Sequence, residues 1–215
     1  IEPPVKMDRS TIFRIYSMTK PVVSVAAMIL FEEGLFHLDD PVSTYLPELA
    51  GLRVYKESDG DSIATTDIER PMTIRHLLTH TSGLANGLSG NSYVDSLYRT
   101  VNILDRGDNL DETPVKLAAF PLLHQPGTIW NYGTSTDVVA VLIERLAGVP
   151  LDEFLHERIF EPLRLSDTRY YVRAEDRQRL AACYERDSTG NWVRSRQFSA
   201  NEYETPPRVH AGGFG

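Results

Sequence analysis

An almost unbroken apolar run over residues 21–31 follows the polar tetrapeptide SMTK (17–20). The run falls short of the roughly 20 apolar residues that a membrane-spanning helix needs, so we interpret it as a helix of a protein core. Proline is tolerated in the first turn of a helix, so Pro21 places the start of this helix near the serine of SMTK. Gly34 is a typical helix stop. The sequence therefore predicts a buried helix over 17–33 and no membrane span.

Composition limits the partners and the compartment of the chain. The 215 residues are 41% hydrophobic and 24% charged, which fits one globular domain or a domain with a sizeable insertion. Thirty acidic residues outnumber 22 basic ones, and the basic residues are scattered, so we expect no nucleic-acid partner. Cys183 is the single cysteine and cannot form an intramolecular disulfide. The N-terminal residues lack the order of a secretory signal, which favours a cytoplasmic location, or a periplasmic or secreted one if a signal peptide was removed.

Caps, first-turn prolines and terminal glycines predict four further helices, over 73–79, 114–119, 135–146 and 151–159. Two shorter runs, 12–16 and 168–172, have the composition of strands. Segments 54–70 and 85–111 are rich in Gly, Ser, Asn and Asp, so we expect loops there. These elements predict a mainly helical region with too few strands to close a sheet.

Ser17 and Lys20 have the spacing of a nucleophile and its base. Residues three apart on a helix share a face, with Cβ atoms roughly 5–6 Å apart, so the lysine amine can reach the serine hydroxyl. The unpaired N–H groups of a helix N-terminus favour developing negative charge, so the Ser17 backbone N–H is a candidate oxyanion donor. The same spacing also arises by chance, with Ser17 as a helix cap and Lys20 in solvent. On its own the motif leaves both interpretations open.

Two further segments settle the choice. They are "PMTIRHLLTHTSGL" (71–84) and the stretch 130–171, which begins "WNYGTSTDVV". With the S-x-x-K motif, in this order, they resemble the serine hydrolases related to class C β-lactamases and penicillin-binding proteins, especially the β-lactamase-like carboxylesterases. The resemblance covers nearly the whole chain. It implies an α/β (α+β) fold of the β-lactamase and penicillin-binding-protein type, with a mainly helical domain and part of a sheet domain.

The resemblance also implies a mechanism and its residues. Ser17 attacks a carbonyl and Lys20 accepts its proton. Tyr132 relays protons, first to the leaving group and later in the step with water. Met18 and Thr134 are expected to contact substrate. The Ser17 backbone N–H is expected in the oxyanion hole, and its second donor is not identified. The implied substrate is a small ester or amide, and no cofactor or metal is implied.

One motif departs from the β-lactamase pattern. Those enzymes usually have Tyr-x-Asn, whereas this chain has Tyr132-Gly133-Thr134, followed by the Asp137-Val138 pair that the esterases often carry. Carboxylesterase activity is therefore the preferred interpretation. β-Lactamase and D-amino-acid peptidase activities are the alternatives within the enzyme class, and a non-catalytic penicillin-recognising homologue is the alternative of another class.

The chain is short at both ends for this family. The segment "HAGGFG" (210–215) formally fits the third family motif, His-x-Gly, but is closer to a glycine-rich turn, and few residues precede Ser17. We therefore expect a chain truncated at both ends, which needs the missing sequence or a second chain for stability and activity. The expected parts are a strand end with the nucleophile helix, the helical domain, and an incomplete return to the sheet domain: 1–34, 35–170 and 171–215.

Two rival sites are disfavoured by their spacing. His76 and His80 stand four apart on a predicted helix, but the glutamate of the zinc-protease motif is absent, so we expect them to hydrogen-bond the loop 81–83 instead. The G-x-S-x-G motif of an α/β-hydrolase is also absent, because "GLSG" (87–90) is one residue too short.

Overall fold

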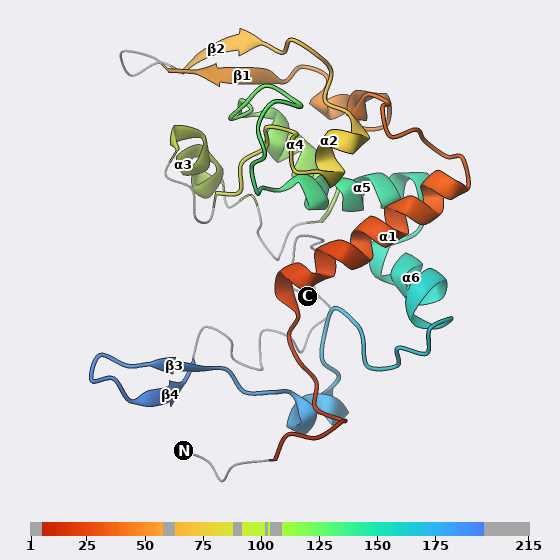
Figure 1. Ribbon diagram of the computed structural model, residues 1–215, viewed down its shortest axis with the longest axis vertical. Helices are drawn as coiled ribbons and strands as arrows, with labels where there is room; N and C mark the ends of the chain where they lie inside the picture. The colour runs from red at the N-terminus through yellow and green to blue at the C-terminus, as the bar shows by residue number, and fades with distance from the viewer. Residues whose placement is uncertain (1–5, 58–62, 88–91, 102, 104–108, 196–215) are drawn as a thin grey trace.

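The computed structural model describes residues 6–57, 63–87, 92–101, 103 and 109–195. The helices occupy the middle of the molecule, and a β-hairpin projects at each end (Figure 1). The segment 210–215, which formally fits the third family motif, lies outside the described residues. In the part of the chain that the structure describes, every helix is too short or too polar to traverse a bilayer.

The regular elements of the described residues are α-helices and short strands, joined by turns and longer loops. The α-helices are α1 (Thr19–Glu32), α2 (Ile74–Leu78), α3 (Tyr93–Thr100), α4 (Glu112–Ala118), α5 (Ser135–Ala147) and α6 (Leu151–Leu155). The strands are β1 (Arg53–Lys56), β2 (Ala64–Asp67), β3 (Tyr184–Arg186) and β4 (Trp192–Arg194). Irregular helical turns are found at Tyr16–Met18, Val42–Thr44, Pro47–Leu49, His156–Phe160 and Ala174–Arg179. β1 pairs antiparallel with β2, and β3 with β4, so the described residues form two hairpins.

The core is built around the packing of α1 against α5 (Figure 1). α1 buries Val23, Ala26, Ala27 and Leu30, which recur at the i, i+3, i+4, i+7 spacing of one helix face. The two alanines at the centre of that face allow a close approach of the neighbouring helix. α5 is buried from its first residue as far as Ile143, which is typical of a central helix. In this packing the N-terminal ends of α1 and α5 lie close together.

The helix predictions are confirmed, with shifted ends. α2 begins one residue later than expected because Thr73 is its N-cap: the Thr73 hydroxyl accepts from the His76 backbone N–H, and His76 Nδ1 accepts from the Thr73 N–H. The helix expected over 151–159 is α-helical only to Leu155 and continues as a π-helical turn. The helix expected from residue 17 begins at Thr19, so Pro21 is its third residue and lies in the first turn.

The strand and loop predictions are wrong in four places. Residues 12–16 and 168–172 form no strand; Ile12 makes a single bridge to Leu180, which no strand of the described residues extends. The expected loop 54–70 contains most of the β1–β2 hairpin, whose strands are four residues each and bury only Val54. The expected loop 85–111 contains α3, capped by the Ser92 hydroxyl.

Candidate active site

Ser17 lies in a tight turn immediately before α1. The turn spans Tyr16–Met18, and Tyr16 has a φ of +43°, a left-handed conformation that is unfavourable for a residue with a large side chain. Such strain is retained where surrounding contacts enforce it, and it is frequent at functional sites. The turn leaves Ser17 exposed and directs Lys20, in the first turn of α1, back toward it. The Lys20 ammonium donates to Ser17 Oγ across 3.4 Å.

Tyr132 meets Ser17 from a distant part of the chain. Its hydroxyl donates to Ser17 Oγ across 2.7 Å. The nitrogen of Lys20 lies 4.9 Å from the centre of the Tyr132 ring. Tyr132 comes three residues before α5, and Ser17 comes two residues before α1. The packing of α1 on α5 therefore brings the three predicted side chains together.

Side-chain amides attach the segment around Tyr132 to the segment 84–86. Asn131 Nδ2 donates to the Leu84 carbonyl across 3.0 Å, and Asn86 Nδ2 donates to the Tyr132 carbonyl across 2.9 Å. No local pattern predicts either role, because each amide bonds a backbone carbonyl that is 46 or 47 residues away along the chain. These bonds hold the backbone that carries the Tyr132 ring.

Gly133 and Thr134 complete this attachment. A Cβ at Gly133 would lie 2.3 Å from the Leu84 carbonyl oxygen and 2.9 Å from that of Ala85, so only glycine permits this approach of the two backbones. The Thr134 N–H and hydroxyl both donate to the Ala85 carbonyl, and Thr134 is 1% exposed. The Thr134 hydroxyl is therefore buried against the backbone, and its expected contact with substrate stays a prediction.

The electrostatics of the site favour the ionised phenol. Burial raises the pKa of Tyr132, but hydrogen bonds with Lys20 and Ser17 and the positive charge of Lys20 outweigh that effect, so the pKa lies below its ordinary value. A phenol with a lowered pKa exchanges protons more readily near neutrality. The three groups can therefore form a nucleophile with a shared acid–base pair.

His80 packs beside this group. Its ring lies against Tyr132, with centroids 5.1 Å apart and planes inclined by 29°, and Trp130 contacts both rings. Burial lowers the pKa of His80, and the charge of Lys20 lowers it further. His76 hydrogen-bonds the loop 81–83 as predicted, through its backbone carbonyl, which accepts from the Thr81 N–H, whereas its side-chain Nδ1 accepts from the Thr73 N–H. The buried Nδ1 of His80 has no hydrogen-bond partner among the described residues.

Met18 is 69% exposed beside Ser17, a position from which it can reach a bound molecule.

Within the described residues, no group of three or more His, Cys, Asp or Glu side chains has an arrangement that would hold a metal ion. The site therefore consists of hydroxyl, amine and aromatic groups.

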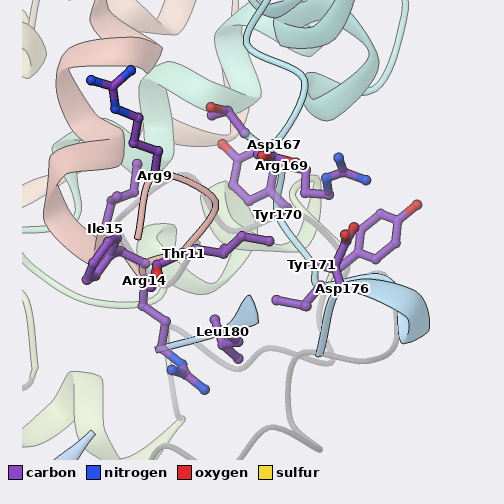
Figure 2. A pocket seen from close by; sticks show the side chains of 14 residues that line it. Arg9, Thr11, Arg14, Ile15, Asp167, Arg169, Tyr170, Tyr171, Asp176 and Leu180 are labelled. Atoms are coloured by element: carbon purple, nitrogen blue, oxygen red, sulfur yellow. The ribbon is translucent and has the colours of Figure 1, made fainter. Parts of the chain in front are cut away.

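A separate cavity of about 300 Å³ lies between residues 9–15 and 167–180 (Figure 2). Arg9 and Arg14 line it from the N-terminal segment, and Tyr170 and Asp176 from the other. The three residues around Ser17 Oγ do not line this cavity. It is therefore distinct from the site described above.

Comparison with protein families gives a match along the whole chain. The model of the family described as Beta-lactamase matches residues 1–215. Protein Rv1367c from Mycobacterium tuberculosis (strain ATCC 25618 / H37Rv) is 39% identical over 187 residues, covering 87% of this chain and 46% of that protein. Esterase EstB from Burkholderia gladioli is 36% identical over 182 residues, covering 83% and 43%. The chain thus spans about half the length of the curated relatives it matches.

Solved structures agree with this match. EstCE1, described as a hydrolase with promiscuous acyltransferase activity, is 32% identical with a TM-score of 0.72, covering 88% of this chain and 47% of that one. A penicillin binding protein from Bacillus halodurans has a TM-score of 0.67 at 21% identity, covering 97% and 57%, and shows likeness of fold alone.

Proposed function

The chain belongs to the Beta-lactamase family, and from this premise we propose that it is a serine hydrolase that cleaves small carboxylic esters through an acyl-enzyme. The observation that carries the proposal is the meeting of three groups: the Tyr132 hydroxyl at 2.7 Å and the Lys20 amine at 3.4 Å from Ser17 Oγ. The predicted α/β (α+β) fold of β-lactamases and penicillin-binding proteins is confirmed, and the esterase among its relatives supports an esterase-like hydrolase.

In the acylation step, Ser17 Oγ forms a bond to the carbonyl carbon of the ester. The serine proton passes to the Lys20–Tyr132 pair, and the carbonyl oxygen becomes an oxyanion. The Ser17 backbone N–H is the proposed donor to that oxyanion. The tetrahedral intermediate then collapses: the bond to the alcohol oxygen breaks, and this oxygen takes a proton from Tyr132. The acyl group remains on Ser17.

Deacylation repeats these steps with water. A water molecule gives a proton to the Lys20–Tyr132 pair and attacks the acyl carbon, and the bond to Ser17 Oγ breaks as that oxygen regains its proton. The carboxylic acid leaves and the starting protonation is restored. Met18, exposed beside Ser17, is the proposed contact for the apolar part of the substrate.

The surroundings of Tyr132 favour esters over lactams. In β-lactamases the side-chain amide of the asparagine that is third in the tyrosine motif contacts the substrate, but here that residue is Thr134, which is buried and whose hydroxyl donates to the Ala85 carbonyl. β-Lactamase and D-amino-acid peptidase activities remain the alternatives, and they make different predictions in the same assays.

The test compares substrates on the full natural protein. Hydrolysis of p-nitrophenyl butyrate, lost in Ser17→Ala, is the expected result, with slower turnover of nitrocefin and of a D-alanyl anilide. Faster turnover of nitrocefin or of the anilide would move the assignment to a lactamase or peptidase. Absence of turnover on all three, with the protein folded, would favour a non-catalytic homologue.

A further inference from the structure

The side chain of His80 supports the Tyr132 ring and makes no recorded contact with Ser17. The two rings stack at 5.1 Å, and Trp130 meets His80 edge-on with centroids 6.2 Å apart. Tyr132 is 38% exposed, so a large part of its surface has no protein neighbour. A side chain this open keeps one orientation only if its packed face is fixed. The His80 ring supplies a face for that purpose.

The backbone of His80 lies in the left-handed region. Its φ is +55°, a conformation that glycine adopts freely and in which asparagine, aspartate and histidine are enriched. The Asn131 N–H donates to the His80 carbonyl across 2.8 Å, which ties this turn to the segment that carries Tyr132. Because the turn would also accept asparagine or glycine, the backbone alone does not require an imidazole here. The ring contacts do give one.

The surroundings of His80 keep its ring uncharged. Its Nδ1 is buried and has no hydrogen-bond partner among the residues that the structure describes, so a protonated ring would bury an N–H donor without an acceptor. Lys20 and the phenol of Tyr132 are the titratable groups that face it, and burial and the Lys20 charge both lower the pKa of His80. A neutral ring packs against Tyr132 without adding a second positive charge beside Lys20.

We propose that His80 is a positioning residue, whose neutral ring fixes the orientation in which the Tyr132 hydroxyl meets Ser17 Oγ. The inference rests on the proposed function, since it concerns how Tyr132 transfers protons. A misplacement of about 1 Å at a reacting group can lower a rate by up to 100-fold, so loss of this support is expected to affect kcat.

The test compares two substitutions in the full natural protein with p-nitrophenyl butyrate. His80→Asn suits the left-handed backbone and removes the ring, whereas His80→Phe keeps a ring of similar shape. We expect His80→Asn to lower kcat by about tenfold with little change in KM, and His80→Phe to stay within about threefold of the parent. His124→Asn, at another half-buried histidine, is the matched control and should leave kcat unchanged.

The pH profile separates positioning from a merely structural role. If the ring holds the phenol against Lys20 and Ser17, His80→Asn weakens the bonds that lower the pKa of Tyr132, so the limb where the rate rises with pH moves to higher pH. A folded His80→Asn with the parental kcat and pH profile would overturn the inference. Equal losses of kcat in His80→Asn and His80→Phe, with the rising limb of the pH profile unmoved, would also overturn it. If His80→Phe does not fold, the position of the rising limb in the pH profile of His80→Asn is the deciding measurement.

Ser17→Ala distinguishes a failure of the proposed function from a failure of the role of His80. If Ser17→Ala retains turnover, the proposed function fails, whatever the His80 variants do. If Ser17→Ala is inactive while His80→Asn matches the parent, only the role of His80 fails.

Discussion

The Tyr132 hydroxyl donates a hydrogen bond of 2.7 Å to Ser17 Oγ across a sequence separation of 115 residues. This contact exists because each residue lies just before a long helix, and those helices pack against each other through the small residues of α1 and the buried face of α5. The geometry of the site is therefore a consequence of core packing. Changes to the core near the helix starts should affect activity as well as stability.

Removing the phenol hydroxyl tests the role of Tyr132. Tyr132→Phe keeps the ring contacts with His80 and Trp130, so we expect the protein to fold as before. Loss of a general acid–base group typically lowers the rate by about 100-fold or more. Steady-state hydrolysis of p-nitrophenyl butyrate, with a thermal melt beside it, measures both effects. A variant with parental kcat would remove Tyr132 from the mechanism.

Removing the charge of Lys20 tests the electrostatics of the site. Lys20→Met retains an unbranched side chain without the charge and should slow acylation strongly, because the Lys20–Tyr132 pair is the proposed acceptor of the serine proton. Burial, the larger cause of the lowered pKa of His80, remains, but the charge of Lys20 is gone, so that pKa should rise while staying below its ordinary value. An NMR titration of the imidazole protons follows this shift. An unchanged His80 titration would contradict the placement of the ammonium.

A methyl group at Gly133 tests the close approach of two backbones. In Gly133→Ala the new Cβ would meet the carbonyl oxygens of Leu84 and Ala85 at 2.3 and 2.9 Å, so the segment carrying Tyr132 must shift. We expect a loss of about 1–3 kcal/mol in the free energy of unfolding, as for other overpacked sites, and a reduced kcat. Gly51→Ala is the control, because its Cβ would meet no atom within 4 Å, and both quantities should stay near the parental values.

A partly buried ion pair between α5 and the turn Pro47–Leu49 makes stability depend on pH. The Arg145 guanidinium forms two hydrogen bonds with Glu48, at 2.9 and 2.5 Å, and holds the pKa of that carboxyl below its ordinary value. A lowered folded-state pKa contributes stability above the unfolded-state pKa, and this contribution is lost as the pH falls through the folded-state pKa. Glu48→Gln should therefore lower the free energy of unfolding by about 1 kcal/mol at neutral pH, and by less in acid.

Urea unfolding at pH 7 and at pH 3 measures this difference. Glu57→Gln, at an exposed carboxylate, is the control and should change the free energy of unfolding by less than about 0.5 kcal/mol. Equal losses for Glu48→Gln at both pH values would show that the pair does not couple protonation to folding.

Apart from α3, the helices could be predicted from the sequence because their signals are local. Pro21 marked the start of α1 to within two residues, and Gly34 marked its end. The β1–β2 hairpin could not, since its strands are short and mostly exposed and show no clear alternation. α3 was not predicted, because its apolar residues stand among polar ones in a segment rich in turn-forming residues.

The same division applies to the site. The spacing of Ser17 and Lys20 predicts their contact, because both lie within one turn of chain. Tyr132 was found only through family resemblance, since its contact depends on how two helices pack. The amides of Asn86 and Asn131 and the ring of His80 act on distant backbone or side chains, and no local pattern indicates them. The division into 1–34, 35–170 and 171–215 and the need for further sequence or a second chain stay predictions.

Covalent labelling of Ser17 tests the central claim most directly. The full natural protein is treated with a fluorophosphonate, digested and analysed by mass spectrometry, with Ser17→Ala and Lys20→Met treated in parallel. The account predicts one adduct on the peptide that carries Ser17, absent from Ser17→Ala and formed much more slowly in Lys20→Met. An adduct on another serine, or an unlabelled Ser17 in a protein that hydrolyses p-nitrophenyl butyrate, would contradict it.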